Sequence, residues 1–320
     1  MSKPLANRGK KIVALSGGVG GAKLALGLSK VLDAEQLTIV ANTADDFEHL
    51  GLSISPDLDT VMYTLAGIAN PATGWGVTGE SWSMMTALAR YGGPTWFQLG
   101  DRDLATHLLR SQWLHEGYPH SWVTKELCTR LGIRCTLLPM SEEPIRTMLQ
   151  TAREELPFQE YFVHQRCEPV VTGIRFAGAD KAQPSREVIN AVREADVIIF
   201  CPSNPLISIG PILSMPSLRR IIAATRVPKI AVSPIIGGEA VKGPAAKLMG
   251  ELQMDVSPVG VAKHLQEVLT HFVIDHVDQA LQDPLSDMGL RTLVTATFMQ
   301  SDSDKVRLAE EVLAFAGMGG

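Results

Sequence analysis

The sequence lacks the long apolar runs and the cysteine patterns that mark several large classes of protein. No stretch reaches the roughly 18 uninterrupted apolar residues that a membrane-spanning helix needs. The 4 cysteines show no CxxC spacing and no histidine-rich neighbourhood, so we expect reduced thiols rather than a zinc site or a disulfide framework. Residues 1–11 are followed by too short an apolar run for a secretory signal. We therefore expect a cytoplasmic protein with no membrane partner.

Positive charge is also scarce. The chain has 29 Lys and Arg against 34 Asp and Glu, a formal net charge of −5 and a pI near 5.9, with no basic cluster. It has no long-range field that would gather a nucleic acid polymer, so we expect no nucleic acid partner. Small phosphorylated ligands are compatible with this charge, because a few backbone amides and one or two cations can hold a phosphate.

What the sequence does contain is an alternation of apolar runs and helical segments. The runs 11–15, 37–41, 197–201 and 229–233 are typical of buried strands. Such runs alternating with helices predict an α/β fold of the doubly wound, Rossmann-like kind, with a mostly parallel sheet. We expect residues 1–320 to form a single α/β domain with a helical insertion around 60–150 over the carboxyl edge of the sheet. A closing amphipathic helix is predicted near 303–315.

A glycine-rich turn, SGGVGGAK at 16–23, stands between the first predicted strand and a helix. Small residues there would let backbone amides at the helix N-terminus approach a phosphate. The turn is neither a complete GxGxxG nor a Walker A motif, and the alternative is a tight structural turn. If the amides wrap a phosphate, Gly20→Val should weaken binding at a modest cost in stability. The candidate substrate-binding residues of this turn are Gly17, Gly18, Gly20, Gly21 and Lys23.

Aspartates gather in two segments, 42–46 (NTADD) and 55–60 (SPDLDT), near the sheet edge where open α/β sheets bind ligands. Their mutual repulsion is relieved when Mg²⁺ sits among the carboxylates and also neutralises substrate phosphates. Asp57 could instead cap the helix that follows it. The candidate metal ligands are Asp45, Asp46 and Asp59, and the candidate catalytic carboxylates are Asp45 and Asp59.

Three further loops carry candidate ligand contacts. In LGDRD (99–103), Arg102 is expected to fork onto a phosphate or carboxylate, the alternative being a structural ion pair. We assign no role to His107. The loops 201–210 and 233–238 follow predicted strands and offer hydroxyl, amide and glycine groups to a nucleotide. The candidate substrate-binding residues in these loops are Arg102, Ser203, Asn204 and Gly237.

Together these motifs closely resemble the 2-phospho-L-lactate transferase family of deazaflavin coenzyme F420 biosynthesis. SGGVGGAK, NTADDF, SPDLDTVMY, LGDRDLATH, LPMS, PSNPLISIGPI and SPIIGG occur in the family's order over nearly the whole chain. The resemblance implies a phosphotransferase-type enzyme that moves the phospho-acid part of a guanosine diphosphate-linked three-carbon acid to the terminal hydroxyl of the deazaflavin Fo and releases GMP. It also implies Mg²⁺ and a homodimer. Phospholactyl, phosphoenolpyruvyl and 3-phosphoglyceryl donors all remain open.

Such a transfer needs positioning and charge neutralisation rather than a covalent protein nucleophile. On this hypothesis Asp45, Asp46 and Asp59 hold Mg²⁺ on the diphosphate. Arg102 and the glycine-rich turn stabilise its developing charge, and Asp59 orients the attacking hydroxyl. The tryptophan-containing segment 75–82 would form a wall of the deazaflavin pocket by stacking.

Two alternatives belong to other classes of protein. A non-enzymatic regulator that binds a nucleotide sugar on a similar scaffold usually carries DDGGSSG in its aspartate loop, whereas residues 45–49 here are DDFEH. An NAD-dependent dehydrogenase needs a GxGxxG turn and an acidic residue at the end of the second strand, which here ends in Ala41-Asn42.

Overall fold

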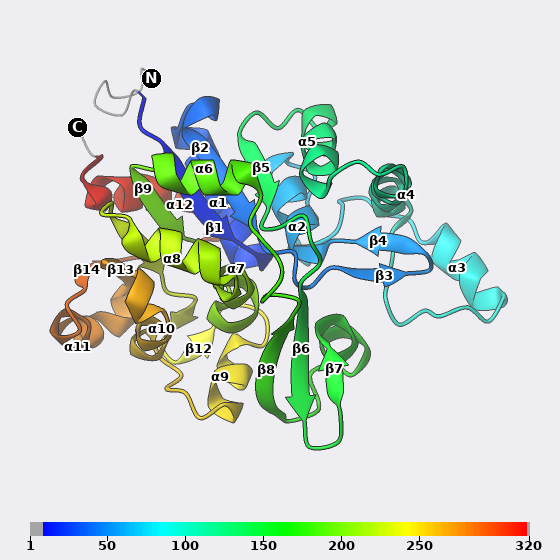
Figure 1. Ribbon diagram of the computed structural model, residues 1–320. Helices are drawn as coiled ribbons and strands as arrows, with labels where there is room; N and C mark the ends of the chain where they lie inside the picture. Colours follow the sequence, from blue (N-terminus) through cyan, green and yellow to red (C-terminus); the bar gives the residue numbers. More distant parts are fainter. Residues whose placement is uncertain (1–8, 319–320) are drawn as a thin grey trace.

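The computed structural model describes residues 9–318 and shows a central sheet with helices on both faces (Figure 1). All neighbouring strands in this sheet are parallel, which confirms the predicted doubly wound α/β class. The four predicted strands are β1, β2, β9 and β10. The seven strands are, in spatial order, β14 (Arg291–Thr295), β13 (His271–Asp275), β10 (Lys229–Val232), β9 (Val197–Phe200), β1 (Ile12–Ser16), β2 (Leu37–Ala41) and β5 (Thr136–Pro139).

Two apolar cores cover the two faces of the sheet, because successive strand residues point to opposite sides. Ile12 and Ala14 belong to one core, and Val13 and Leu15 to the other. The first core is completed by α1 (Gly18–Val31), α2 (Pro56–Leu65), α5 (His120–Arg130) and α12 (Asp302–Leu313). The second is completed by α6 (Arg186–Glu194), α7 (Gly210–Ser214), α8 (Pro216–Ala224), α9 (Ala245–Glu251), α10 (Pro258–Leu265) and α11 (Gln282–Asp287).

The strand order reverses at β1. After β1 the chain adds β2 and β5 on one side, and it then adds β9, β10, β13 and β14 on the other. Ligands of open α/β sheets bind beyond the carboxyl ends of the strands at such a reversal point. The topology therefore points to the loops after β1 and β9.

The range predicted as a helical insertion contains three helices outside the sheet, α3 (Ser83–Arg90), α4 (Asp101–His115) and α5. The same range also holds β5 of the central sheet and β6 (Arg146–Thr151). A three-stranded antiparallel sheet of β6, β7 (Glu155–Pro157) and β8 (Val171–Ala177) extends away from the central sheet (Figure 1). Two hairpins are short: β3 (Phe47–His49) with β4 (Leu52–Ile54), and β11 (Ile235–Ile236) with β12 (Glu239–Ala240).

The closing helix predicted near 303–315 is α12. Most of the basic N-terminal segment, residues 1–8, lies outside the described residues. Within residues 9–318 no single helix is long and apolar enough to cross a membrane; only the pair Pro205–Ser214 and Pro216–Ala224 passes on length and composition, with a 92° bend between them.

Candidate active site

A cavity of about 530 Å³ lies at the carboxyl edge of the central sheet, at the reversal point of the strand order. The loops after β1, β2, β9, β10 and β14 all line it, so the topology and the cavity agree. Aromatic side chains also line the cavity. Those from segments outside the central sheet and the loops that follow its strands include Trp75, Phe97, Phe158 and Phe162.

The glycine-rich turn delivers the N-terminus of α1 to this cavity. Gly17 is the N-cap residue and offers no side-chain cap, and no acidic residue occupies the first turn of the helix. Gly18 has a φ of +60°, a conformation that favours glycine. Gly17, Gly18, Gly20 and Lys23 line the cavity, whereas Gly21 does not. The Gly17 N–H donates to the Ser203 hydroxyl oxygen at 3.1 Å, and the Gly18 N–H donates to the Asp57 carboxylate. Amides at a helix N-terminus attract anions, so a phosphate would bind beside these contacts.

The reason for the glycine at position 20 differs from the predicted one. A Cβ there would lie 2.3 Å from the backbone oxygen of Pro202, in the loop after β9. A Cβ at Gly21 would lie 2.3 Å from the Ser203 hydroxyl oxygen. These glycines let α1 pack against that loop. The expectation that Gly20→Val separates binding from folding is therefore wrong, since the added side chain would displace protein backbone.

Two lysines stand at the same end of the cavity. The Lys23 ammonium donates to the Met299 carbonyl at 2.7 Å, and the Lys242 ammonium donates to the Thr73 carbonyl at 2.8 Å. Burial lowers the pKa of Lys23, and the positive charge of Lys242 lowers it further. An anionic ligand between the two lysines would relieve that repulsion.

Asn42 holds Asp45 and Asp57 together. Its amide nitrogen donates to Asp45 Oδ2 at 3.1 Å and to Asp57 Oδ2 at 3.0 Å. Burial raises the pKa of Asp45 well above its usual range, and the nearby Asp57 carboxylate raises it further. Asp45 Oδ1 is buried without a hydrogen-bond partner. A cation bound between these two carboxylates would compensate their negative charge.

The helix-cap alternative for Asp57 is wrong, because α2 begins at Pro56 after the N-cap residue Ser55. Asp57 lies in the first turn, and its carboxylate also accepts a hydrogen bond from the Ser208 hydroxyl at 3.2 Å. Both Asp45 and Asp57 line the cavity.

Asp46 has a different environment. Its carboxylate accepts a hydrogen bond from the Ser55 hydroxyl at 2.8 Å, and it does not line the cavity. Burial raises the pKa of Asp46 to about 8. Within residues 9–318 no group of three or more His, Cys, Asp or Glu side chains is arranged to hold a metal ion. The predicted set of Asp45, Asp46 and Asp59 is thus not gathered around one point.

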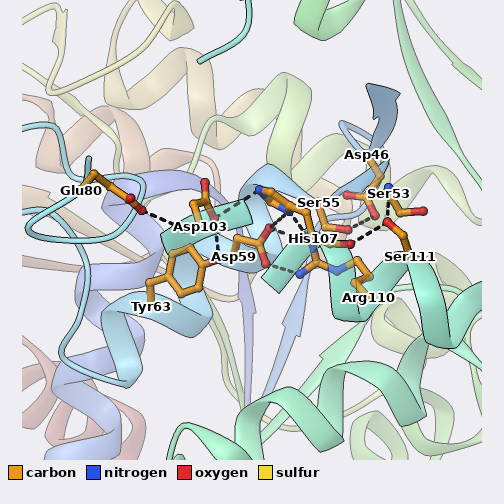
Figure 2. Close-up of polar contacts among 10 residues, drawn as sticks. All are labelled: Asp46, Ser53, Ser55, Asp59, Tyr63, Glu80, Asp103, His107, Arg110 and Ser111. Carbon is orange, nitrogen blue, oxygen red and sulfur yellow. Dashed lines mark hydrogen bonds and ion pairs between the residues drawn. The ribbon is translucent and has the colours of Figure 1, made fainter. Parts of the chain in front are cut away.

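Asp59 lines the cavity and is paired with an arginine that the sequence analysis did not single out. Arg110 Nη1 donates to Asp59 Oδ2 at 2.9 Å, and Nη2 donates to Oδ1 (Figure 2). The arginine comes from α4 and the aspartate from α2. Asp59 is 5% exposed and Arg110 only 1%.

Arg102 lies outside the cavity. It is exposed, and its guanidinium donates to the Thr78 carbonyl at 3.0 Å. The neighbouring residues Asp101 and Asp103 differ in their contacts. Asp101 accepts from the backbone N–H of Ser83 and Met84 at the start of α3, whereas Asp103 lines the cavity. A phosphate contact from Arg102 stays a prediction that the side chain's position does not favour.

Two of the three residues predicted from the late loops line the cavity. They are Ser203 and Asn204, and the side-chain nitrogen of Asn204 is buried without a hydrogen-bond partner. Gly237 does not line the cavity; its N–H donates to the Asp278 carboxylate at 3.0 Å, and its neighbour Ile236 is the lining residue. Trp75 of the predicted stacking segment lines the cavity, whereas Trp82 does not.

The chain is similar to known proteins along nearly its whole length. A family model described as 2-phospho-L-lactate transferase CofD matches residues 12–309. A phosphoenolpyruvate transferase from Streptomyces griseus is 40% identical over 312 residues, covering 96% of this chain and 98% of that protein. A 2-phospho-L-lactate transferase from Methanosarcina mazei is 37% identical over 302 residues, covering 94% and 99%. A solved structure of a UPF0052 family protein from Bacillus halodurans aligns with a TM-score of 0.63 at 15% identity, over 98% of this chain and 99% of that one, which shows the fold alone.

Proposed function

Since this chain belongs to the 2-phospho-L-lactate transferase family, we propose that it moves a phospho-acid group from a guanosine diphosphate-linked donor to the deazaflavin alcohol Fo. GMP is the second product. The reaction would serve coenzyme F420 biosynthesis.

The observation that carries this proposal is that anion-binding groups and aromatic side chains line one and the same cavity. The N-terminus of α1 and Lys23 suit a diphosphate. Trp75, Phe97 and the phenylalanines of segment 158–162 offer faces on which a deazaflavin ring can stack. The acceptor and the donor phosphates would therefore meet in one cavity.

The carboxylates fit a magnesium ion. Mg²⁺ is commonly bound by one or two carboxylates together with substrate phosphates and water. Asp45 and Asp57 would supply the carboxylates, because both line the cavity and Asn42 holds them together. Bound there, the ion would neutralise the diphosphate charge. Asp59 is already compensated by Arg110, and Asp46 lies behind the cavity wall, so we place both outside the primary ligand pair.

The transfer itself is a displacement at phosphorus. The terminal hydroxyl oxygen of Fo forms a bond to the phosphorus that bears the three-carbon acid, and the bond from that phosphorus to the bridging oxygen breaks. GMP leaves with the bridging oxygen, and the hydroxyl proton passes to a carboxylate of the cavity wall, for which Asp59 is our candidate. The amides of α1 and Lys23 would stabilise charge on the phosphates.

The identity of the acid is tested by offering the enzyme Fo with three guanylylated donors, carrying lactate, enolpyruvate or glycerate, and identifying the products by mass spectrometry. We expect one donor to give a deazaflavin phospho-acid together with GMP. Because one relative is named for phosphoenolpyruvate and another for 2-phospho-L-lactate, this assay compares the donors that the relatives' names suggest. Donor binding without transfer of any of the three would contradict the proposal and favour a nucleotide-binding regulator.

A homodimer and a cytoplasmic location belong to the same proposal. The homodimer is supported by large apolar side chains that are exposed on the helices α4 and α5 or in residues next to α3 and α5. These are Trp82, Tyr91, Leu108, Tyr118 and Trp122. Light scattering of the purified protein tests the dimer directly.

A further inference from the structure

A buried polar network lies behind Asp59 and joins α2 to α4 (Figure 2). On one side of His107, the guanidinium of Arg110 binds both carboxylate oxygens of Asp59. On the other side, His107 Nε2 lies 3.2 Å from Asp103 Oδ1, which also accepts a hydrogen bond from the Tyr63 hydroxyl at 2.6 Å. Asp59, Tyr63, Asp103 and His107 all line the cavity, whereas Arg110 does not.

His107 lies between Arg110 and Asp103. Its Nδ1 is 3.3 Å from Arg110 Nη1, and since a guanidinium nitrogen can only donate, Nδ1 is the acceptor of this contact. Its Nε2 faces Asp103 Oδ1 at 3.2 Å. The ring therefore packs beside the Asp59–Arg110 pair and separates it from Asp103.

Arg110 compensates the charge of Asp59 and also fixes its orientation. A guanidinium that binds both oxygens of a carboxylate fixes the plane in which the carboxylate lies, whereas a single ammonium would leave it free to rotate. Arg110 is 1% exposed, so this contact is made without competing water. A buried ion pair adds little net stability over an apolar replacement, so stability alone is a weak reason for its presence.

We propose that Arg110 is a positioning residue for the transfer reaction, which binds both carboxylate oxygens of Asp59 and so fixes the orientation of this carboxylate at the cavity wall. The proposal rests on the proposed function, in which Asp59 meets the attacking hydroxyl. Arg110 itself touches no substrate. Its loss should therefore reduce turnover far more than substrate binding.

The first experiment is a stability cycle, which needs no substrate. Arg110→Met leaves a buried carboxylate without its partner and should lower the thermal midpoint, and Asp59→Asn combined with Arg110→Met should recover much of that loss. Arg175→Met is the matched control, because Arg175 forms a similar two-point pair with Glu155 on the surface. Its midpoint should move little. Additive midpoints in the cycle would overturn the proposed pairing.

The second experiment measures kcat, KM and donor affinity well below the lowest midpoint. We expect Arg110→Met to lower kcat by about 100-fold and Arg110→Lys by about 10-fold, with donor Kd from calorimetry within about threefold of wild type. A folded Arg110→Met with wild-type kcat would overturn the proposal; if that variant does not fold, wild-type kcat in Arg110→Lys would. A wild-type protein that transfers nothing would instead contradict the proposed function, and the stability cycle would still decide the pairing.

Discussion

Asp45 and Asp57 share the amide of Asn42 and form no salt bridge among the described residues, whereas Asp59 is paired with Arg110. The cavity carboxylates therefore differ in charge compensation. Burial raises the pKa of Asp45 and of Asp57, so their ionised forms cost folding energy. Buried carboxylates without a positively charged partner are typical of a site that binds a charged ligand.

This difference predicts opposite effects of Asp57→Asn on stability and function. In excess chelator the variant should have a thermal midpoint a few degrees above wild type, because one of two neighbouring buried charges is gone. Added Mg²⁺ should raise the midpoint of wild type and leave that of Asp57→Asn unchanged. Asp46→Asn is the matched control and should keep the Mg²⁺ response. A full Mg²⁺ response in Asp57→Asn would remove Asp57 from the ion site.

At the scale of elements, four strands of the central sheet, β1, β2, β9 and β10, were predicted because continuous runs of apolar and β-branched residues are typical of buried parallel strands, whereas β13 and β14 were not predicted. The helix α12 was predictable from its amphipathic spacing. The insertion was harder: β5 and β6 are short, and their place is set by pairing with β2 and β8. Pairing partners so distant in sequence leave no local pattern.

The packing of α1 against α12 gives an element-scale prediction. Alanine is a better helix former than glycine by about 1 kcal/mol, yet a Cβ at Gly27 would lie 2.1 Å from the Lys305 carbonyl oxygen. Gly27→Ala should therefore destabilise the fold by about 1–3 kcal/mol in urea unfolding. In α9, a Cβ at Gly250 meets only Val256 at 3.7 Å, so Gly250→Ala should be neutral or stabilising. Equal gains in both variants would show that α1 and α12 are not in close contact.

The first residue of α5 predicts a pH effect. Burial lowers the pKa of His120 to about 3, and the charges of Arg110 and Arg146 lower it further. Between that value and the ordinary 6.5, only the unfolded chain takes up the proton, so stability should fall as the pH drops through this window. The contribution is up to about 1.4 kcal/mol per pH unit. His120→Gln should flatten the acid slope of the unfolding free energy, and His115→Gln, on the exposed end of α4, should not. Parallel slopes in wild type and His120→Gln would contradict this account.

At the scale of the whole molecule, the sequence predicted which edge of the sheet carries the candidate site. It did not predict which charged side chains of the site pair with one another. Glycine turns and aspartate loops are local patterns, so the α1 turn, Asp45 and Asn204 could be found without a structure. Arg110 is one arginine in the middle of a helix, and its role appears only when α4 packs beside α2. Arg102 looked more promising because it stands at a helix start, where the structure exposes it.

The most direct test of the central claim is the release of GMP with and without the acceptor. On the proposed function the cavity would hold donor and acceptor together and stabilise charge without a covalent protein nucleophile, so a guanylylated phospho-acid should yield GMP only when Fo is present. GMP and the deazaflavin phospho-acid should then form in equal amounts, and Asp45→Asn should reduce both by about 100-fold or more. One equivalent of GMP per enzyme released without Fo, or GMP formed with no deazaflavin product, would contradict the account.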